Sequence, residues 1–311
     1  ARYQWKIAPE DVVLVPGVVS GFNLAAQALT PPGSSLMVQT PIYPPFLAAA
    51  TNAGARRITA DLVEQPDGRY GIDFEAFERA MEADTRTFIM SNPHNPVGRV
   101  YTREELMKLG EICLRHGVTL ISDEIHSDLV YRGYQHIPVA SLSPELAVNS
   151  VTLIAPSKTF NVAGLNCGVL ICTDPKKRKQ MEEAGRGLPG HVNILGQVAA
   201  LAAYRDGQAW LDELLLELEE NRDLLYEFVA EHLPSIKMAK PEGTYLAWLD
   251  CRGLQLPTDP YHFFLERAKV ALNDGREFGK AGEGFLRLNF GCSQRTLLEA
   301  LTRMEKALKA I

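Results

Sequence analysis

The stretch Ile154-Ala-Pro-Ser-Lys-Thr-Phe-Asn161 places Lys158 directly after a short apolar run. Asn95 and Asp123 follow two earlier apolar runs in equivalent positions. Short β-branched or apolar runs that stop abruptly at polar, proline or glycine residues are typical of buried parallel strands. The carboxyl ends of such strands form the ligand-binding edge of an open α/β sheet. We therefore predict an α/β fold in which these three side chains meet at one edge.

Five apolar runs predict a mostly parallel, doubly wound sheet. The segments between them favour helices: Thr102 and Glu105 have the spacing of a capping box, residues 104–115 are amphipathic, and Gly117 ends that helix. Alternating strands and helices of this kind indicate βαβ units. The predicted strands are Val12 to Val15, Leu36 to Val38, Phe88 to Met90, Val118 to Ile121 and Val151 to Ile154.

Composition favours a water-soluble enzyme. The chain has 311 residues, of which 46% are hydrophobic and 23% charged, and its formal net charge is -6. An acidic chain without a basic tract argues against nucleic acid or an anionic membrane as a partner. No apolar run reaches the length of about 18 residues that a membrane span needs, and no signal-peptide pattern is present, so a cytoplasmic location is expected. The five cysteines show no metal-ligand spacing and are expected to be reduced thiols.

Lys158 and Asp123 together indicate pyridoxal chemistry. A lysine that forms a Schiff base must lose its proton, so it needs a partly desolvated pocket, which we expect around Lys158. Asp123 closes a hydrophobic strand, where a carboxylate is costly to bury without a cationic partner such as a protonated pyridine nitrogen. The alternatives are a solvated loop lysine and an aspartate that caps a helix.

Asn95 and Tyr43 are candidates for contacts with the cofactor ring. Asn95 lies in Ser91-Asn-Pro-His-Asn-Pro-Val-Gly98, where its amide can donate to the phenolic oxygen and the prolines fix the loop. A plain turn is the alternative for this segment. Tyr43 can lay its ring over the pyridine, or it can be a packed loop aromatic.

Two further features are candidates for binding anions. The segment Pro16 to Gln27 reads as a tight turn into a helix, and the free amides at a helix N-terminus bind phosphate. Arg287 stands in an otherwise apolar, strand-like run, where its permanent charge needs an anion. That anion is either a substrate carboxylate or an internal acidic side chain.

Taken together, these motifs resemble the fold-type I pyridoxal phosphate enzymes of the class I/II aminotransferase superfamily, over nearly the whole chain. They are most similar to the MalY/PatB branch, whose members are cystathionine β-lyases or cysteine-S-conjugate β-lyases. The segments that carry this resemblance are Ser122 to Leu129, Pro156 to Leu165, Gly243 to Asp250 and Leu286 to Cys292.

The resemblance implies a role for each site residue. Lys158 holds pyridoxal 5'-phosphate covalently and later carries a proton, and Asp123 pairs with the pyridine nitrogen. Asn95 donates to the phenolic oxygen and contacts the substrate, while Tyr43 stacks on the ring. His126 occupies the position where many relatives place a tyrosine near the phenolic oxygen, and simple packing beside the site is its alternative.

The resemblance also implies two anion contacts, and one of them departs from the family pattern. The amides of Val18 and Val19 cradle the phosphate, and Arg287 clamps the substrate carboxylate. Many relatives add a serine and an arginine to the phosphate site, where this chain has Ala155 and Asn166. Phosphate binding is then expected to use the helix N-terminus, Ser157 or groups from a partner subunit.

The implied architecture is a large cofactor-binding domain, residues 1–212, and a smaller C-terminal α/β domain, residues 213–311. A leucine- and glutamate-rich helix, residues 210–232, bridges them, and residues 270–284 read as a strand followed by a glycine-rich loop. The resemblance implies a homodimer. It also implies an N-terminal segment, which this sequence lacks: the chain starts at Ala1 without a methionine.

The expected reaction is a carbon-sulfur β-lyase reaction on a small amino-acid substrate. Lys158 removes the Cα proton and a thiolate leaves from Cβ, which yields pyruvate and ammonia. An aminotransferase would use the same residues together with an oxo-acid acceptor. A third possibility is a regulatory relative with impaired catalysis, although the retained Lys158 and Asp123 argue against it.

Overall fold

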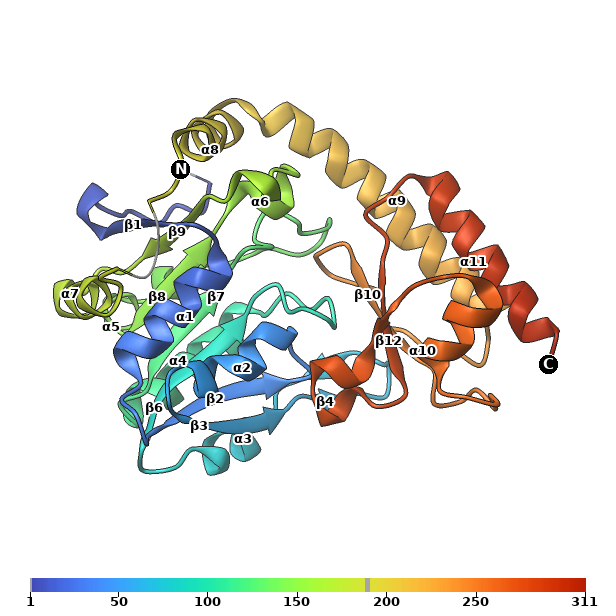
Figure 1. Cartoon of the computed structure of the whole chain (residues 1–311), viewed down its shortest axis with the longest axis horizontal. Coiled ribbons are helices and arrows are strands. Elements are labelled where there is room, and N and C mark those ends of the chain that lie inside the picture. The colour runs from blue at the N-terminus through green and yellow to red at the C-terminus, as the bar shows by residue number, and fades with distance from the viewer. Residues whose placement is uncertain (1, 188–190) are drawn as a thin grey trace.

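A seven-stranded mixed sheet forms the centre of the larger part of the molecule (Figure 1). The computed structural model describes residues 2–187 and 191–311. The strand order is β1-β9-β8-β7-β6-β2-β3, in which β8, β7, β6, β2 and β3 run parallel, while β9 is antiparallel to both of its neighbours. The strands of this sheet are β1 (Val12–Val15), β2 (Ser35–Thr40), β3 (Arg56–Asp61), β6 (Thr85–Ser91), β7 (Thr119–Asp123), β8 (Ser150–Ile154) and β9 (Gly168–Ile171).

Helices cover the two faces of this sheet (Figure 1). The central strands β2 and β7 are buried along their whole length, as expected for parallel strands with helices on both faces. Phe22 of α1 and Leu109 of α4 belong to two separate apolar clusters, and residues of the central strands contribute to both. The helices of this part are α1 (Val18–Leu29), α2 (Pro44–Asn52), α3 (Phe74–Ala80), α4 (Arg103–Arg115), α5 (Pro144–Val148), α6 (Pro156–Thr159), α7 (Pro175–Ala184) and α8 (Ile194–Asp206).

The C-terminal part is a three-stranded antiparallel sheet with helices packed against it. The order of its strands is β10-β12-β11, and a single apolar cluster joins them to α9 and α11. Its elements are α9 (Gln208–His232), β10 (Leu246–Asp250), α10 (Pro260–Phe263), β11 (Asn273–Asp274), β12 (Phe285–Asn289) and α11 (Gln294–Lys309). A two-stranded ribbon of β4 (Val63–Glu64) and β5 (Tyr70–Gly71) leaves the large sheet after β3.

The helix α9 spans from the large sheet to the C-terminal part (Figure 1). The predicted boundary between residues 212 and 213 falls in its first turns, and the C-terminal apolar cluster begins at Leu211. Leu129 and Tyr131, which precede α9 by some 80 residues of chain, also belong to that cluster. The division at 212 and 213 therefore stays a prediction. Within the described residues, no helix is long and apolar enough to cross a membrane.

Several sequence predictions of local structure are confirmed. Thr102 caps α4 by accepting from the Glu105 amide at 3.2 Å, while the Glu105 carboxylate accepts from the Thr102 amide at 2.8 Å. Gly117 has a φ of +63° at the end of this helix, where a residue without Cβ is favoured. All five predicted strands exist, and none of their bounds differs from the prediction by more than three residues.

Three predictions of local structure are wrong. Val12–Val15 is not a buried parallel strand but an edge strand antiparallel to β9, and Leu14 is 46% exposed. The strand β3 was not predicted, because it lies at the edge of the sheet and contains charged residues in place of an apolar run. In residues 270–284, the only strand is the two-residue β11, because the Asp274 side chain accepts from the Arg276 amide at 3.0 Å and starts a 3-10 turn.

Candidate functional site

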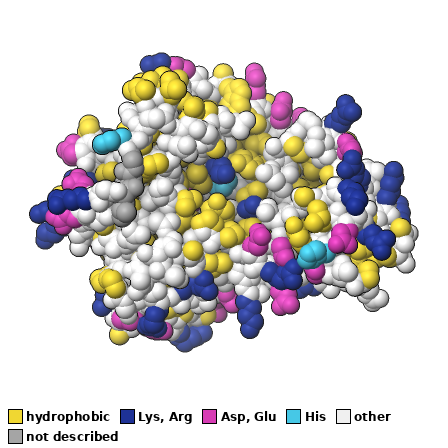
Figure 2. Space-filling view, viewed as in Figure 1, with side chains coloured by type: hydrophobic (Ala, Val, Ile, Leu, Met, Phe, Trp, Pro, Cys, Tyr) yellow, Lys and Arg dark blue, Asp and Glu magenta, His cyan; other side chains and the backbone are white. Residues whose placement is uncertain are grey.

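A cavity of about 430 Å³ lies where the carboxyl ends of the parallel strands face β10 and β12. Figure 2 shows this face hollowed between the two parts of the molecule, with basic and histidine side chains inside the hollow. The start of α1 and the turns after β6, β7 and β8 supply most of its wall. All nine predicted site residues line it: Val18, Val19, Tyr43, Asn95, Asp123, His126, Ser157, Lys158 and Arg287.

Asp123 is the last residue of β7 and is 5% exposed. Its Oδ1 accepts from the Ile125 amide at 2.9 Å, so it caps a turn and not a helix. Among the described residues, it takes part in no ion pair. The pKa of Asp123 is raised to about 7, mainly by burial and also by the neighbouring Glu124 charge, while the hydrogen bond from the Ile125 amide and the Lys158 charge act in the opposite direction. A positive charge bound inside the cavity would therefore stabilise the ionised form of this carboxyl.

Lys158 lies in α6, the short helix that begins directly after β8. Its side chain is exposed within the open cavity. The expectation of a partly desolvated lysine is therefore not met by the chain on its own, because the cavity opens to solvent on the lysine side. The expectation that the side chains after the strand ends lie close together is met, since Lys158 and Asp123 line the same cavity although 34 residues of sequence separate them.

His126 is 4% exposed, and its Nδ1 is buried without a hydrogen-bond partner. Its ring meets the Tyr245 ring edge to face, with 5.8 Å between the centroids. Burial lowers the pKa of His126 to about 3, and the positive charges of Lys158 and Arg287 act in the same direction. His126 is therefore a neutral imidazole with one ring nitrogen free for a ligand.

Arg287 projects from β12 into the cavity opposite Asn95. Its Nη1 donates to Asn95 Oδ1 at 2.9 Å and its Nη2 donates to Asn273 Oδ1 at 2.7 Å, while its Nε is buried without a partner. The guanidinium carbon lies 4.8 Å from the centroid of the Phe278 ring. Burial lowers the pKa of Arg287, although an arginine stays protonated at neutral pH.

The alternative of an internal salt bridge for Arg287 is not what the structure shows. In the described ranges, no aspartate or glutamate lies within ion-pair distance of it; its two partners are neutral amides. A buried guanidinium that is held only by amides retains its attraction for an anion. The Arg287 end of the cavity therefore has the chemistry that suits an anionic group.

The opposite end of the cavity is formed by the turn into α1. Gly17 caps this helix without a side-chain bond, so the amides of Val18, Val19 and Ser20 point free. Gly168 of β9 packs against the turn so closely that a Cβ there would lie 3.1 Å from Gly17 Cα. A fixed turn with free amides at a helix N-terminus is suited to bind a phosphate group.

Ser20, Tyr245 and Asn289 are among the cavity residues that were not singled out from the sequence. Signals for the last two were present. Asn289 lies two residues after Arg287 on a strand, and such residues point to the same face. Tyr245 belongs to the segment Gly243 to Asp250, which was noted for its resemblance but not as part of the site.

A doubly wound sheet with a lysine and an aspartate at its carboxyl edge, and an arginine held only by amides in the same cavity, is typical of α/β enzymes that bind a small molecule at that edge. The chain belongs to the aminotransferase class I and II family, whose model matches residues 1–304.

Among the relatives and solved structures that this chain resembles, two of those described here are named as lyases. The chain is 44% identical to cystathionine beta-lyase PatB of Bacillus subtilis over 310 residues, which cover 99% of this chain and 80% of PatB. The structure of cystalysin from Treponema denticola, which contains pyridoxal 5'-phosphate, matches with a TM-score of 0.96 at 34% identity, over 99% of this chain and 79% of cystalysin. A PLP-bound C-S lyase from Staphylococcus hominis matches with a TM-score of 0.92 at 31% identity, over 99% and 80% of the two chains.

Proposed function

We propose that this protein is a pyridoxal phosphate-dependent carbon-sulfur β-lyase that acts on L-cystathionine or related cysteine S-conjugates. Its products are a thiol, pyruvate and ammonia. The observation that carries this proposal is the similarity to cystathionine beta-lyase PatB over 99% of the chain, together with the cavity that holds Lys158, Asp123 and Arg287. An aminotransferase remains the alternative, because the same residues serve both reactions.

The cavity fits pyridoxal 5'-phosphate at four separate points. The buried Asp123 carboxyl lacks a cationic partner among the described residues, as a position opposite a pyridine nitrogen requires. His126 Nδ1 is an unpartnered polar atom in the same wall. The free amides of Val18 and Val19 suit the phosphate, with Ser157 close by in the lining. Tyr43 lines the cavity where its ring can cover the cofactor.

The roles of the polar residues follow from their charge. Asp123 keeps a positive charge on the ring nitrogen, because a carboxylate buried at that depth is stabilised only beside a cation. Asn95 Oδ1 accepts a hydrogen bond from Arg287, so the NH₂ group of Asn95 is left to donate toward the phenolic oxygen. Neutral His126 offers a ring nitrogen to the same region without adding a charge. Bound pyridoxal phosphate supplies an electron-accepting ring that holds the electron pair left at the substrate Cα.

The reacting groups of the chain are Arg287 and Lys158. Arg287 binds the substrate carboxylate through its guanidinium fork and so aims the Cα–H bond into the cavity. Lys158 Nζ, as a free amine, takes the proton from Cα. The Cβ–S bond breaks and its electron pair leaves on sulfur as the thiolate, which takes up a proton. The remaining three-carbon enamine is hydrolysed by water to pyruvate and ammonia.

The dependence on an oxo acid tests lyase against aminotransferase. Purified protein is incubated with pyridoxal phosphate and L-cystathionine, and pyruvate is followed with and without added 2-oxo acid. A lyase releases pyruvate over many turnovers without the acceptor, and the acceptor does not accelerate it. Turnover that requires the oxo acid would instead establish an aminotransferase.

Arg287→Lys is expected to raise the KM for L-cystathionine about 10–100-fold with a smaller effect on kcat. Lysine keeps the charge but loses the planar fork that binds a carboxylate through two parallel bonds, each worth about 1.5–3 kcal/mol. Steady-state kinetics of pyruvate release checks this, and an unchanged KM would remove Arg287 from the substrate site.

We also propose that the chain forms a homodimer and that α8 lies in the interface. One face of α8 exposes four large apolar side chains, and Figure 2 shows apolar side chains gathered where Figure 1 places this helix. Contiguous apolar surface of this kind marks association sites. The four residues and their exposed fractions are Ile194 (69%), Leu195 (67%), Val198 (57%) and Leu201 (61%).

Val198→Glu combined with Leu201→Glu is expected to convert the dimer to a monomer, because two buried charges without partners weaken an apolar interface by several kcal/mol. Light scattering coupled to size-exclusion chromatography measures the mass. The matched control is Val148→Glu, which places the same charge at a site that is 51% exposed on α5. A wild-type monomer, or a double variant that stays dimeric, would contradict the proposed interface.

A further inference from the structure

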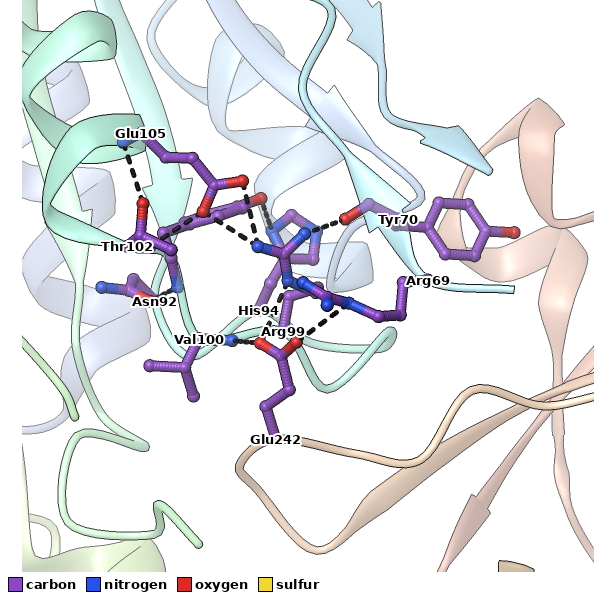
Figure 3. A network of polar contacts seen from close by, with 10 residues as sticks. Arg69, Tyr70, Asn92, His94, Arg99, Val100, Thr102, Glu105 and Glu242 are labelled. Atoms are coloured by element: carbon purple, nitrogen blue, oxygen red, sulfur yellow. Dashed lines mark hydrogen bonds and ion pairs between the residues drawn. The ribbon is translucent and has the colours of Figure 1, made fainter. Parts of the chain in front are cut away.

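A buried ion network outside the cavity lining joins the large sheet's loops to the C-terminal part of the molecule (Figure 3). Arg99, from the loop after β6, is 5% exposed, and Glu242, from the segment before β10, is 2% exposed. Arg99 Nε donates to Glu242 Oε2 at 3.0 Å. Its Nη2 donates to both oxygens of Glu105 at 3.0 and 2.9 Å. Neither charge belongs to the proposed chemistry, so their burial needs another reason.

All three nitrogens of this guanidinium donate hydrogen bonds. Arg99 Nη1 donates to the Tyr70 carbonyl oxygen, and Glu242 Oε2 also accepts from the Val100 amide at 2.8 Å. Arg69 Nε lies 3.2 Å from Glu242 Oε1 as a second cation. Glu105 is fixed by the capping box of α4, so the network is anchored in a rigid helix. Buried charges that are paired in this way favour one geometry of the chain around them.

The network clamps two backbone segments together. The amides of Glu242 and Gly243 both donate to the Gly98 carbonyl oxygen, at 2.8 and 3.1 Å. Gly98 has a φ of +73°, and a Cβ on it would lie 2.9 Å from Pro241 Cβ. The loop that carries Asn95 thus packs directly against the segment that carries Tyr245. Each of these two residues lines the cavity.

Thr244, between the clamp and Tyr245, has an unusual backbone. Its φ is +67°, a conformation that β-branched residues adopt only when the surroundings impose it. Its amide donates to the Leu129 carbonyl oxygen at 2.7 Å and its carbonyl oxygen accepts from Tyr131 Oη at 2.6 Å. The strained turn sets the direction of the next side chain, which places the Tyr245 ring against His126.

We propose that Arg99 and Glu242 are positioning residues that hold Tyr245 and Asn95 at the substrate end of the cavity, and that Tyr245 contacts the bound amino acid. This inference rests on the proposed function. Tyr245 is half-buried, lines the cavity and meets the His126 ring edge to face, so its own ring forms part of the wall that a bound amino acid would face. A shift of about 1 Å in such a wall can cost on the order of 100-fold in rate.

The test measures binding and turnover separately in Glu242→Gln, Arg99→Lys and Tyr245→Ala. The probe for binding is α-methyl-L-methionine, a thioether amino acid without a Cα proton, which is titrated against the absorbance of the bound cofactor. We expect each variant to raise the Kd of the probe and the KM for L-cystathionine at least 10-fold. The absorbance spectrum of the cofactor without probe stays unchanged, since Lys158 and Asp123 are untouched.

Asp11→Asn is the matched control. Asp11 pairs with Arg178 of α7 at 2.9 Å in a partly buried ion pair, and neither residue lines the cavity, so its loss changes stability but not the Kd of the probe. If Glu242→Gln does not fold, Glu242→Asp keeps the charge and displaces it by one methylene, and the same rise in Kd is expected. Unchanged Kd values in the folded variants would overturn the inference. A wild-type protein that binds the probe but releases no pyruvate would refute the proposed lyase activity. The Kd values of the variants would then still decide whether Arg99 and Glu242 position the wall of the cavity.

Discussion

Lys158→Ala is expected to lower pyruvate release from L-cystathionine by at least about 1,000-fold. General base catalysis by a positioned side chain contributes roughly 10²–10⁴-fold, and this substitution also removes the covalent attachment of the cofactor. Pyruvate release by the purified variant, measured against wild type at equal concentrations of folded protein, checks the expectation.

Folding provides the control for this variant. Because the Lys158 side chain is exposed, its truncation should leave the thermal unfolding of the cofactor-free protein within about 0.5 kcal/mol of wild type. Lys158→Arg keeps the charge but cannot lose its proton at neutral pH, so it should be as inactive as the alanine variant. Substantial turnover in either variant would show that another residue carries the proton.

Asp123→Asn is expected to lower kcat/KM by about 100–1,000-fold, the range found when a single preorganised electrostatic contact is removed from an active site. The amide is nearly isosteric, so the cavity keeps its shape while the ring nitrogen loses its anionic partner. The cofactor should still bind, which its absorbance after gel filtration reports. An Asp123→Asn variant with wild-type kcat/KM would contradict the role of this carboxylate.

The same substitution has a pH-dependent effect on stability in the cofactor-free protein. Burial raises the pKa of Asp123 from 3.8 to about 7, so the folded chain holds a proton that the unfolded chain has lost between these values. Stability therefore falls as pH rises through this window, by up to about 4 kcal/mol. Asp123→Asn removes this slope and should be the more stable protein at pH 8. Parallel curves of unfolding free energy against pH for the two proteins would show that Asp123 is not the cause.

Much of the site was predictable because its residues follow strand ends. Asn95, Asp123 and Lys158 each come directly after a buried apolar run, and the carboxyl ends of adjacent parallel strands must meet. Arg287 was found for a different reason, since a guanidinium within an apolar strand needs an anion. The strand-end pattern placed Asn95, Asp123 and Lys158 together, and the family resemblance added Arg287; the cavity contains all four.

The rest depended on tertiary contacts that leave no local pattern. Nothing near Arg99 or Glu242 in the sequence reveals that 143 residues of chain fold back to join them. The exposure of Lys158 depends on how widely the cavity opens and not on its apolar neighbours. The direction of β1 depends on its pairing with β9, which an apolar run cannot report.

The stoichiometry of products from L-cystathionine tests the proposed β-lyase most directly. Thiol, pyruvate and ammonia are quantified over at least about 100 turnovers with pyridoxal phosphate present and no oxo acid added. The lyase chemistry derived for Lys158 and Arg287 predicts equal amounts of the three products, all abolished by Lys158→Ala. Product formation that stops after about one equivalent per active site, and resumes only when an oxo acid is added, would contradict it and establish transamination.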